Sequence, residues 1–231
     1  MKARDVMTTN VITVSPNESV QEVAELLLRH RISAVPVIDQ SGKPIGIVSE
    51  GDLLRRAEVG TDRHRSWWLR LLVGNEALAA EYVKAHATKV ADVMTKKVIA
   101  ADPKTPLSEV ATLLERHSIK RVPIVENGRL VGIVSRANLV QAFATARKRG
   151  ESEITPGDAV IRENLMARLE SEPWARTWLL NVIVQDGVVD LWGMVSSDAE
   201  RNAIRVAAET MPAVRAVNDH LVRQPLESGA Y

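Results

Sequence analysis

A long internal repeat constrains the fold of this chain more than any other feature of its sequence. The segment that begins at Arg4 reads RDVMTTNVITVSPNESVQEVAELLLRHRISAVPVI, and the segment that begins at Ala91 reads ADVMTKKVIAADPKTPLSEVATLLERHSIKRVPIV. Each copy continues through a turn into the letters GIVS, at Gly46 and at Gly132. A repeat of this density predicts two copies of one structural unit that share a core.

Each copy carries the same succession of hydrophobic patterns. VITV at 11–14 is a short apolar run and predicts a buried strand. An amphipathic helix follows, because apolar residues then recur at spacings of three and four. These apolar positions are Val20, Val23, Ala24, Leu27 and Leu28. VPVI at 35–38 and IGIVS at 45–49 predict two strands joined by a turn at Gly42, and LLRRA after Asp52 predicts a second helix.

The two GIVS segments lead into different residues. The first copy continues as GIVSEGD and the second as GIVSRAN, so Asp52 is matched by Asn138. Ser49 followed three residues later by Asp52 fits a helix capping box, which explains both residues without any ligand. The start of a helix also presents free N–H groups and a positive dipole end, which can hold an anion. The two interpretations are compatible.

Residues 59–89 form a longer insertion than a linker needs, and they include the adjacent tryptophans Trp67 and Trp68. Together with Leu71 and Leu72, these residues fall at helical spacing. Three interpretations stay open: packing against the repeats, a self-association surface, and a basic amphipathic helix on a membrane surface.

A different module follows the polar run ARKRGESEITPGD, whose Gly and Pro mark a boundary. Apolar residues at helical spacing between Val160 and Leu169 predict a helix. NVIVQDGVVDLWGMV then predicts a hairpin that turns at Asp186 and Gly187. A helix at about 198–211 and a last strand, VRAVNDHLV, complete a small α-β-β-α-β unit.

Composition limits the class of protein. The chain has 231 residues, of which 45% are hydrophobic and 26% charged, as in ordinary globular proteins. The absence of cysteine excludes a disulfide framework, a thiolate metal site and a cysteine nucleophile. The start MKARDVMTTN lacks the apolar core of a secretory signal, and no apolar run approaches the ~18 residues of a spanning helix. We therefore expect a cytoplasmic protein.

Charge is distributed unevenly along the chain. The first 150 residues have an excess of Lys and Arg, and the remainder has an excess of Asp and Glu. A basic first part suits a small anionic ligand, although a solvated surface would explain it as well. The acidic C-terminal part argues against nucleic acid as a partner.

Catalytic signatures are missing from the sequence. The chain contains no Walker-type Gly-rich loop, no HExxH and no GxSxG. His30 and His117 stand near the ends of equivalent predicted helices, where contact with terminal carbonyls explains them. We expect no catalytic residue and no metal site.

The segments DVMT, VITVSP, SAVPV and GIVSEGD, in this order and duplicated, resemble CBS domains. Two such domains in tandem resemble a CBS pair, or Bateman module, over residues 3–58 and 90–145. CBS pairs are regulatory modules that commonly bind AMP, ATP or S-adenosylmethionine in clefts between the repeats. The resemblance implies an adenosine-containing regulatory ligand. Because such pairs often form flat dimers, it also implies a homodimer.

The resemblance assigns residues to two composite clefts. In the family the matching Asp accepts hydrogen bonds from the ribose hydroxyls, and the matching Ser lies near the phosphate. The preferred cleft would comprise Ser49, Asp52, Val98, Ile99, Ala100, Lys120, Arg121, Val122 and Pro123. The second cleft would comprise Val11, Ile12, Thr13, Ser33, Ala34, Val35, Pro36, Ser135 and Asn138. Lys120 and Arg121 would supply charge for a phosphate, although they also fit solvated charges at the entrance of a strand.

Asn138 predicts that the two clefts differ in affinity. A carboxylate offers two acceptor oxygens, whereas an amide offers one oxygen and an NH2 group. Hydrogen bonds to charged groups are worth ~1.5–3 kcal/mol against ~1 kcal/mol for neutral ones, so the deficit is ~1–2 kcal/mol. This corresponds to roughly a five- to thirtyfold weaker affinity at the Asn138 cleft.

VQDGVVDLWGMVSSDAERNAI followed by MPAVRAVNDHLV resembles a BON domain, and the resemblance covers about residues 155–223. Gly187 and Gly193 match the glycines typical of that family, whereas Pro212 and Ala213 stand where it usually has Gly. BON domains occur mostly in envelope proteins and have been linked to phospholipid or protein attachment. The resemblance implies a protein or membrane-surface partner.

Together these features predict mixed α/β and α+β folds, with two β-α-β-β-α CBS repeats forming one module and a small α-β-β-α-β BON domain. The predicted boundaries are 1–58 for the first repeat, 59–89 for the insertion, 90–145 for the second repeat, 146–154 for a linker, 155–224 for the BON domain and 225–231 for a tail. The leading hypothesis is a cytoplasmic, non-enzymatic regulatory protein whose CBS pair senses an adenine nucleotide and whose BON domain mediates interaction or localisation. The alternative is a dimeric interaction scaffold with empty clefts, attached to a protein or membrane partner.

Overall fold

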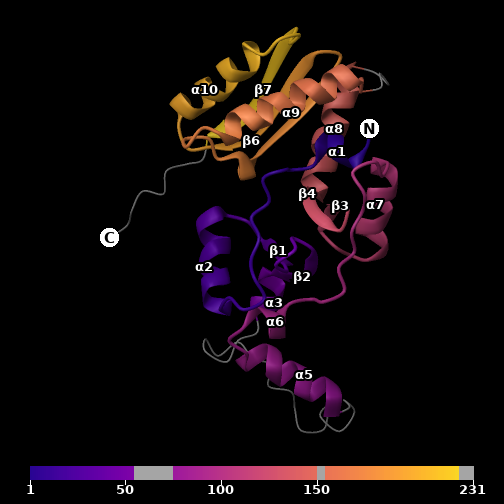
Figure 1. The fold of residues 1–231 in the computed structure, drawn as a ribbon, viewed down its shortest axis with the longest axis vertical. Helices are drawn as coiled ribbons and strands as arrows, with labels where there is room; N and C mark the ends of the chain where they lie inside the picture. The colour runs from indigo at the N-terminus through magenta and orange to yellow at the C-terminus, as the bar shows by residue number, and fades with distance from the viewer. Residues whose placement is uncertain (55–74, 150–153, 224–231) are drawn as a thin grey trace. The chain divides into compact units, whose positions relative to one another are not determined.

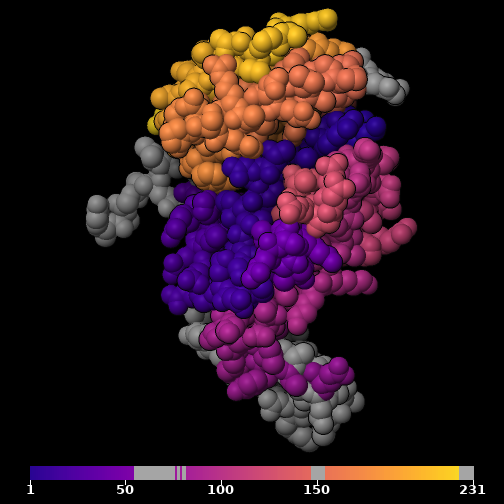
Figure 2. Space-filling model, in the orientation of Figure 1, coloured from indigo at the N-terminus to yellow at the C-terminus, as the bar shows by residue number. Residues whose placement is uncertain are grey.

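The structure is a computed structural model and describes residues 1–54, 75–149 and 154–223 (Figures 1 and 2). It divides into two compact units. The larger unit comprises Met1–Val11, Ala100–Glu126 and Val131–Tyr231, and the smaller unit comprises Ile12–Ile99 and Asn127–Leu130. Trp67, Trp68 and the predicted LLRRA helix beyond Leu54 lie outside the described residues, so the hypotheses about them stay predictions.

The smaller unit is built on an antiparallel hairpin of β1 (Ala34–Ile38) and β2 (Pro44–Ser49). Its helices are α2 (Val20–His30), α3 (Glu50–Leu53), α5 (Asn75–His86) and α6 (Val90–Val93). Buried valines from α2, both strands and α6 form one hydrophobic core in this unit. The two strands predicted at 35–38 and 45–49 are confirmed.

Helix α2 forms because its sequence caps it and gives it one apolar face. Ser19 Oγ accepts from Glu22 N at 3.1 Å, and Glu22 Oε2 accepts from Ser19 N at 2.8 Å, a complete capping box. Val23 and Leu27 are buried, but Leu28 is 77% exposed. Leu28 lies about 100° around the helix from Leu27, so the prediction that it belongs to the buried face is wrong.

The first strand of the repeat is shorter than the apolar run at 11–14 predicts. Only Val14 pairs with β1, in a parallel bridge opposite Val37. Val14 N donates to Pro36 O at 3.1 Å, and Val14 O accepts from Ile38 N at 3.0 Å. The next rung of a parallel ladder would need an N–H from Pro36, which proline does not have. The proline therefore stops the ladder after one bridge.

The larger unit contains the second hairpin, of β3 (Arg121–Glu126) and β4 (Arg129–Ser135). Its helices α1 (Ala3–Val6), α7 (Leu107–Arg116) and α8 (Arg136–Arg149) pack around a core that includes Val122, Ile124 and Val134. Ala101 forms a single parallel bridge with Ile124, which is equivalent to the bridge between Val14 and Val37 in the smaller unit. Pro123 contributes its carbonyl to this bridge, accepting from Ala101 N at 3.0 Å.

The N-terminal DVMT segment packs against the hairpin of the second repeat. Thr8 and Ile133 exchange two backbone hydrogen bonds of 3.0 Å. Met7 lies on Gly132, where a Cβ atom would approach Met7 Sδ to 2.4 Å. Only glycine leaves room for this methionine. We call Met7–Asn10 the N-terminal strap.

The second DVMT segment packs in the same way within the smaller unit. Thr95 N donates to Ile47 O at 2.9 Å, and Ile47 N donates to Thr95 O at 3.1 Å. A Cβ atom at Gly46 would approach Met94 Sδ to 2.4 Å. Each DVMT segment is thus paired with the GIVS strand of the other sequence repeat, which explains why the Met and the Gly recur together.

The C-terminal module has the predicted α-β-β-α-β order. It comprises α9 (Pro156–Glu170), a 3-10 turn (Thr177–Leu179), β5 (Leu180–Gln185), β6 (Val188–Val195), α10 (Asp198–Glu209) and β7 (Ala216–Arg223). The sheet order is β5-β6-β7, with β6 antiparallel to β5 and parallel to β7. Residues of α9, α10 and all three strands share one core, and Figure 1 shows both helices against the sheet.

The hairpin turns at the predicted dipeptide. Asp186 and Gly187 have φ values of 53° and 71°, as a two-residue turn with two left-handed residues requires. A Cβ atom at Gly193 would lie 2.1 Å from Leu179 O, which accounts for the second glycine. Ala213 adopts a left-handed φ of 65°, a backbone conformation that favours Gly.

Asp158 ties the start of α9 to this hairpin. Its side chain is buried, and it accepts from Gly187 N at 2.7 Å, from Thr155 N at 2.9 Å and from Thr155 Oγ1 at 2.7 Å. Burial alone would raise the pKa of Asp158, but these hydrogen bonds outweigh it and lower the pKa below its ordinary value.

A carboxyl group whose pKa is lowered by folding stabilises the protein above its unfolded pKa, and this contribution is lost as the pH falls through the folded pKa. We expect Asp158→Asn to reduce the stability of the module at pH 7 by about 1–3 kcal/mol and to weaken its acid dependence below about pH 4. Native-state hydrogen exchange of β5 and β6 amides, at pH 7 and pH 3, measures both effects. The exposed neighbour Asp186→Asn is the control, and equal stability of the two variants would contradict the assigned role.

Candidate functional site

Asp52 lies where β2 passes into α3. Its Oδ2 atom accepts from Ser49 N at 3.0 Å and from Ser49 Oγ at 2.8 Å, which confirms the predicted capping role. Its Oδ1 atom lies 3.2 Å from Lys84 Nζ. The side chain of Asp52 is only 11% exposed. One carboxylate oxygen therefore serves the cap, and the other remains for a mobile cation or a ligand.

Asn138 occupies the equivalent position where β4 passes into α8. Its only oxygen, Oδ1, accepts from Ser135 N at 2.7 Å and from Ser135 Oγ at 2.6 Å. Asn138 is 5% exposed. A carbonyl oxygen has two lone pairs, so the cap uses the whole acceptor capacity of this side chain. Only its NH2 group remains for a ligand.

The difference between the two positions is therefore larger than a count of oxygens suggests. Both side chains give one oxygen to their serine, but Asp52 keeps a second, negatively charged oxygen. Asn138 keeps a donor instead of an acceptor. The sequence predicts weaker binding at Asn138, and the cap geometry supplies a structural reason for that prediction.

Lys84 is a residue near the candidate site that sequence reasoning missed. It lies in the last turn of α5, and its side chain is 48% exposed. The sequence gives no local signal for its contact with Asp52, because Lys84 lies near the end of the insertion, 32 residues after Asp52. An exposed ion pair of this kind contributes little to stability, but its ammonium group lies at the oxygen that a ribose hydroxyl would use.

The structure distributes the predicted cleft residues over both units. The smaller unit contains Ile12, Thr13, Ser33, Ala34, Val35, Pro36, Ser49, Asp52, Val98 and Ile99. The larger unit contains Val11, Ala100, Lys120, Arg121, Val122, Pro123, Ser135 and Asn138. Each predicted cleft draws on both lists, so the assembly of either cleft stays a prediction.

Within each unit, the segment before the proline lies beside the start of the helix that follows GIVS. Glu50 N donates to Ser33 O at 3.0 Å in the smaller unit, and Arg136 N donates to Lys120 O at 3.1 Å in the larger unit. Ser33 is thus brought close to Ser49. Lys120, which is exposed, is likewise brought close to Ser135. The sequence assigned the members of each of these pairs to different clefts.

Comparison with known protein families identifies the two modules. The CBS domain model matches residues 3–58 and 90–145, and the BON domain model matches residues 157–225. The chain belongs to the family of CBS-domain proteins, as a CBS pair followed by a BON domain.

Relatives of the CBS part are found in bacteria and archaea. The CBS domain-containing protein YhcV of Bacillus subtilis is 33% identical over 137 residues, which are 59% of this chain and 81% of YhcV. The uncharacterized protein MJ1426 of Methanocaldococcus jannaschii is 31% identical over 154 residues, which are 62% of this chain and 91% of that protein.

Among solved structures, the crystal structure of CBSX2 in complex with AMP is similar, with a TM-score of 0.55 and 31% sequence identity. The similarity covers 62% of this chain and 97% of CBSX2. In the parts of the chain that the structure describes, no helix is long and apolar enough to cross a membrane.

The cap geometry predicts that an amide serves at position 52 as it does at position 138. We expect Asp52→Asn to keep both bonds from Ser49 and to change the stability of the protein by less than about 1 kcal/mol. Asp52→Ala removes both bonds and should reduce stability by about 1 kcal/mol. Thermal unfolding of the two variants measures both changes in stability. A larger loss for Asp52→Asn than for Asp52→Ala would show that the charge of Asp52, rather than its cap, stabilises the fold.

Proposed function

We propose that the CBS pair of this chain binds an adenine nucleotide, and that the protein is a regulatory module without an active site of its own. The observation that carries this proposal is the second oxygen of Asp52. This nearly buried carboxylate keeps one acceptor that its own cap does not use. A buried charged acceptor contributes most when it binds a hydroxyl donor, because bonds to charged groups are the stronger ones.

A ribose supplies donors that match this acceptor. Its two neighbouring hydroxyls can both reach one carboxylate, and one oxygen with two lone pairs accepts two hydrogen bonds. Lys84 holds the same oxygen at 3.2 Å. In this proposal Lys84 is the group that a ribose displaces.

The proline in β1 supports recognition of an adenine base. Because Pro36 has no N–H, the carbonyl of Ile12 cannot obtain its ladder donor from that residue. The carbonyl is thereby open to another donor. The exocyclic amino group of adenine is such a donor, and Ile12 is one of the predicted cleft residues.

AMP is the first candidate ligand. The similar structure CBSX2 is a complex with AMP. ATP and S-adenosylmethionine share its adenosine part, so the same ribose and adenine contacts apply to them. Lys120 and Arg121 are the proposed source of positive charge for a phosphate group.

The second cleft is proposed to be the weaker one. Ser135 engages the only acceptor of Asn138 twice, so a ribose at this position would lose its charged partner. The same observation favours the alternative function, an interaction scaffold with degenerate clefts, more than the sequence alone did. Nucleotide binding at the Asp52 cleft decides between these two functions.

The BON domain is proposed to mediate contact with a protein or a membrane surface, and the protein is proposed to act in the cytoplasm as a homodimer. Val140 and Phe143 support self-association. They are 66% and 67% exposed on α8, about one helical turn apart. Large exposed apolar side chains that lie together often mark an interface.

Isothermal titration calorimetry with AMP tests the assignment of the two clefts. We expect Asp52→Asn to weaken the tighter site roughly five- to thirtyfold, because the variant keeps the cap but loses the charged oxygen that pairs with Lys84. Asn138→Asp should strengthen the weaker site by a similar factor. Glu50→Gln, an exposed change in the same helical turn, is the control. No binding of AMP, ATP or S-adenosylmethionine to the wild-type protein would favour the scaffold instead.

The contact of Lys84 with Asp52 leads to a separate expectation. If the ammonium group competes with ribose, Lys84→Ala should tighten AMP binding about two- to fivefold, the range set by an exposed ion pair. Lys89→Ala, in the same unit at the start of α6, should leave the affinity unchanged. A weaker affinity of Lys84→Ala would instead show that Lys84 contacts the bound nucleotide.

A further inference from the structure

The N-terminal strap is held on one side by the BON domain. Asn10 Nδ2 donates to Thr177 Oγ1 at 2.7 Å, and Thr9 Oγ1 donates to Glu170 Oε1 at 3.3 Å. A third contact comes from Arg162 of α9, whose Nη2 atom donates to the backbone carbonyl of Met7. Three of the four residues of the strap are therefore bonded to one domain.

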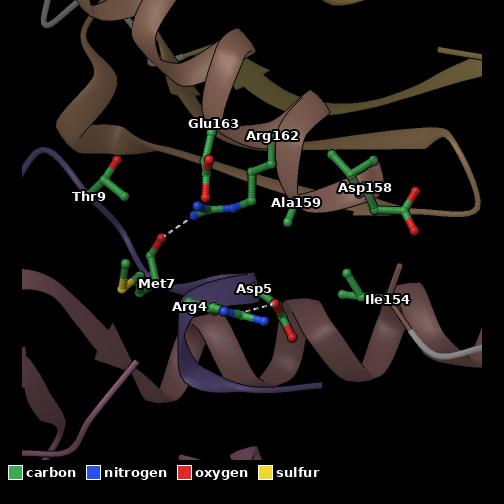
Figure 3. A pocket seen from close by; sticks show the side chains of 10 residues that line it. Arg4, Asp5, Met7, Thr9, Ile154, Asp158, Ala159, Arg162 and Glu163 are labelled. Carbon is green, nitrogen blue, oxygen red and sulfur yellow. Dashed lines mark hydrogen bonds and ion pairs between the residues drawn. The ribbon is translucent and has the colours of Figure 1, made fainter. Parts of the chain in front are cut away.

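Arg162 is the buried charged partner of the strap. Its residue is only 6% exposed, and its Nε atom donates to Val182 O of β5 at 2.8 Å. The guanidinium group thus spans α9, β5 and the strap, and Figure 3 shows it directed from α9 toward Met7. Burial lowers the pKa of Arg162 to about 10, so the group still carries its proton at neutral pH.

A small cavity of about 90 Å³ lies beside this contact, lined by Arg4, Asp5, Met7, Asp158 and Arg162 among others. Asp5 is nearly buried and favours the charged form of Arg162 electrostatically. Desolvating an arginine is costly unless its donors are satisfied. The two carbonyl bonds and the nearby carboxylate compensate that cost only while the strap keeps its position.

The other side of the strap pairs with the second CBS repeat. Thr8 and Ile133 exchange two hydrogen bonds, and Ile133 precedes Ser135 by two residues in β4. Val11, a predicted residue of the second cleft, follows the strap directly. In Figure 2 the indigo N-terminal residues lie against both the orange BON domain and the second repeat. The strap therefore contacts both the BON domain and the second repeat.

The BON domain also contributes to the core of the second repeat. Ile183 of β5 is fully buried among residues of that core, and Asn181 Nδ2 donates to Gln141 Oε1 of α8 at 2.7 Å. The strap is thus flanked by elements that are already fixed to each other. A shift of the strap would have to disturb contacts on both sides.

We propose that Arg162 is a positioning residue that couples the BON domain to the Ser135 and Asn138 end of the CBS pair through the N-terminal strap. The arginine fixes the carbonyl of Met7, the strap pairs with β4, and β4 ends at Ser135, a predicted ligand residue that bonds Asn138 of α8. The ligand half of this coupling rests on the function proposed above. The mechanical half rests on contacts within the larger unit alone.

Hydrogen exchange on the full chain tests the mechanical half without any ligand. We expect Arg162→Gln to accelerate exchange of the Thr8 and Ile133 amides at least about fivefold, the lower limit of ordinary coupling. The amides of Thr95 and Ile47 make the same pairing in the smaller unit, which contains no residue of the BON domain, and should not change. Arg162→Lys, which keeps the charge and one set of donors, should recover part of the protection.

Arg168→Gln is the matched control, because Arg168 lies on the same helix but donates to Ala207 O and Thr210 Oγ1 inside the BON domain. Equal effects of Arg162→Gln and Arg168→Gln on Thr8 and Ile133, or no effect of either, would overturn the coupling. If Arg162→Gln fails to fold, Asn10→Ala removes an exposed link of the same strap. Asn10→Ala is then expected to accelerate hydrogen exchange of the Thr8 and Ile133 amides. Unchanged exchange of these two amides would overturn the proposal.

Adding AMP separates this inference from the proposed function. In the wild-type protein, AMP should slow exchange both at Thr8 and Ile133 and in α9 and β5, and Arg162→Gln should abolish only the second effect. AMP binding without any change in α9 and β5 would overturn the coupling. Absence of AMP binding would reject the proposed function, while the exchange of the variants without ligand still decides whether Arg162 positions the strap.

Discussion

The pairing of each DVMT segment with the GIVS strand of the other repeat is the interaction on which the remaining structure depends. In this pairing the methionine side chain of the DVMT segment packs against the glycine of the GIVS strand, and both residues recur in the two copies. Because of this exchange, the chain leaves the larger unit after Val11 and returns to it at Ala100. The same crossings divide the predicted ligand residues between the two units.

In the function proposed above, helix capping and ligand binding would use the same side chain at the two equivalent positions. At Asp52 the two roles can be fulfilled together, since one oxygen bonds Ser49 and the other is left for a hydroxyl. At Asn138 the cap is intact, but it consumes the only acceptor. A repeat can therefore lose affinity for a nucleotide without losing its fold. This explains how one copy of a duplicated motif can diverge while the other keeps its chemistry.

Much of the architecture could be predicted from the sequence because its signals are local. The capping pair of Ser49 and Asp52, the turn at Asp186 and Gly187 and the apolar spacing of α9 all act within a few residues. The repeat then fixed the order of the elements. The length of the first strand could not be read from its apolar letters, because Pro36, in another strand, ends that ladder.

The contacts around the candidate site were less accessible to sequence reasoning. Lys84 reaches Asp52 from the far end of an insertion, and Arg162 reaches Met7 from another domain. No periodicity or motif links such pairs. Leu28 shows the same limit on a smaller scale, since its place in an apolar pattern did not decide which side of α2 faces the core.

The exchange of DVMT segments also has a consequence for the order in which the chain can fold. Residues 1–11 are synthesised before their partners, such as Pro103, Thr105 and Ile133, which emerge only after most of the CBS pair has been made. Contacts between such distant residues form late, because the chain between them must first be ordered. The apolar side chains of Val6 and Met7 are therefore without their native neighbours during that interval, and residues 1–11 are among the last parts of the CBS pair to reach their final place.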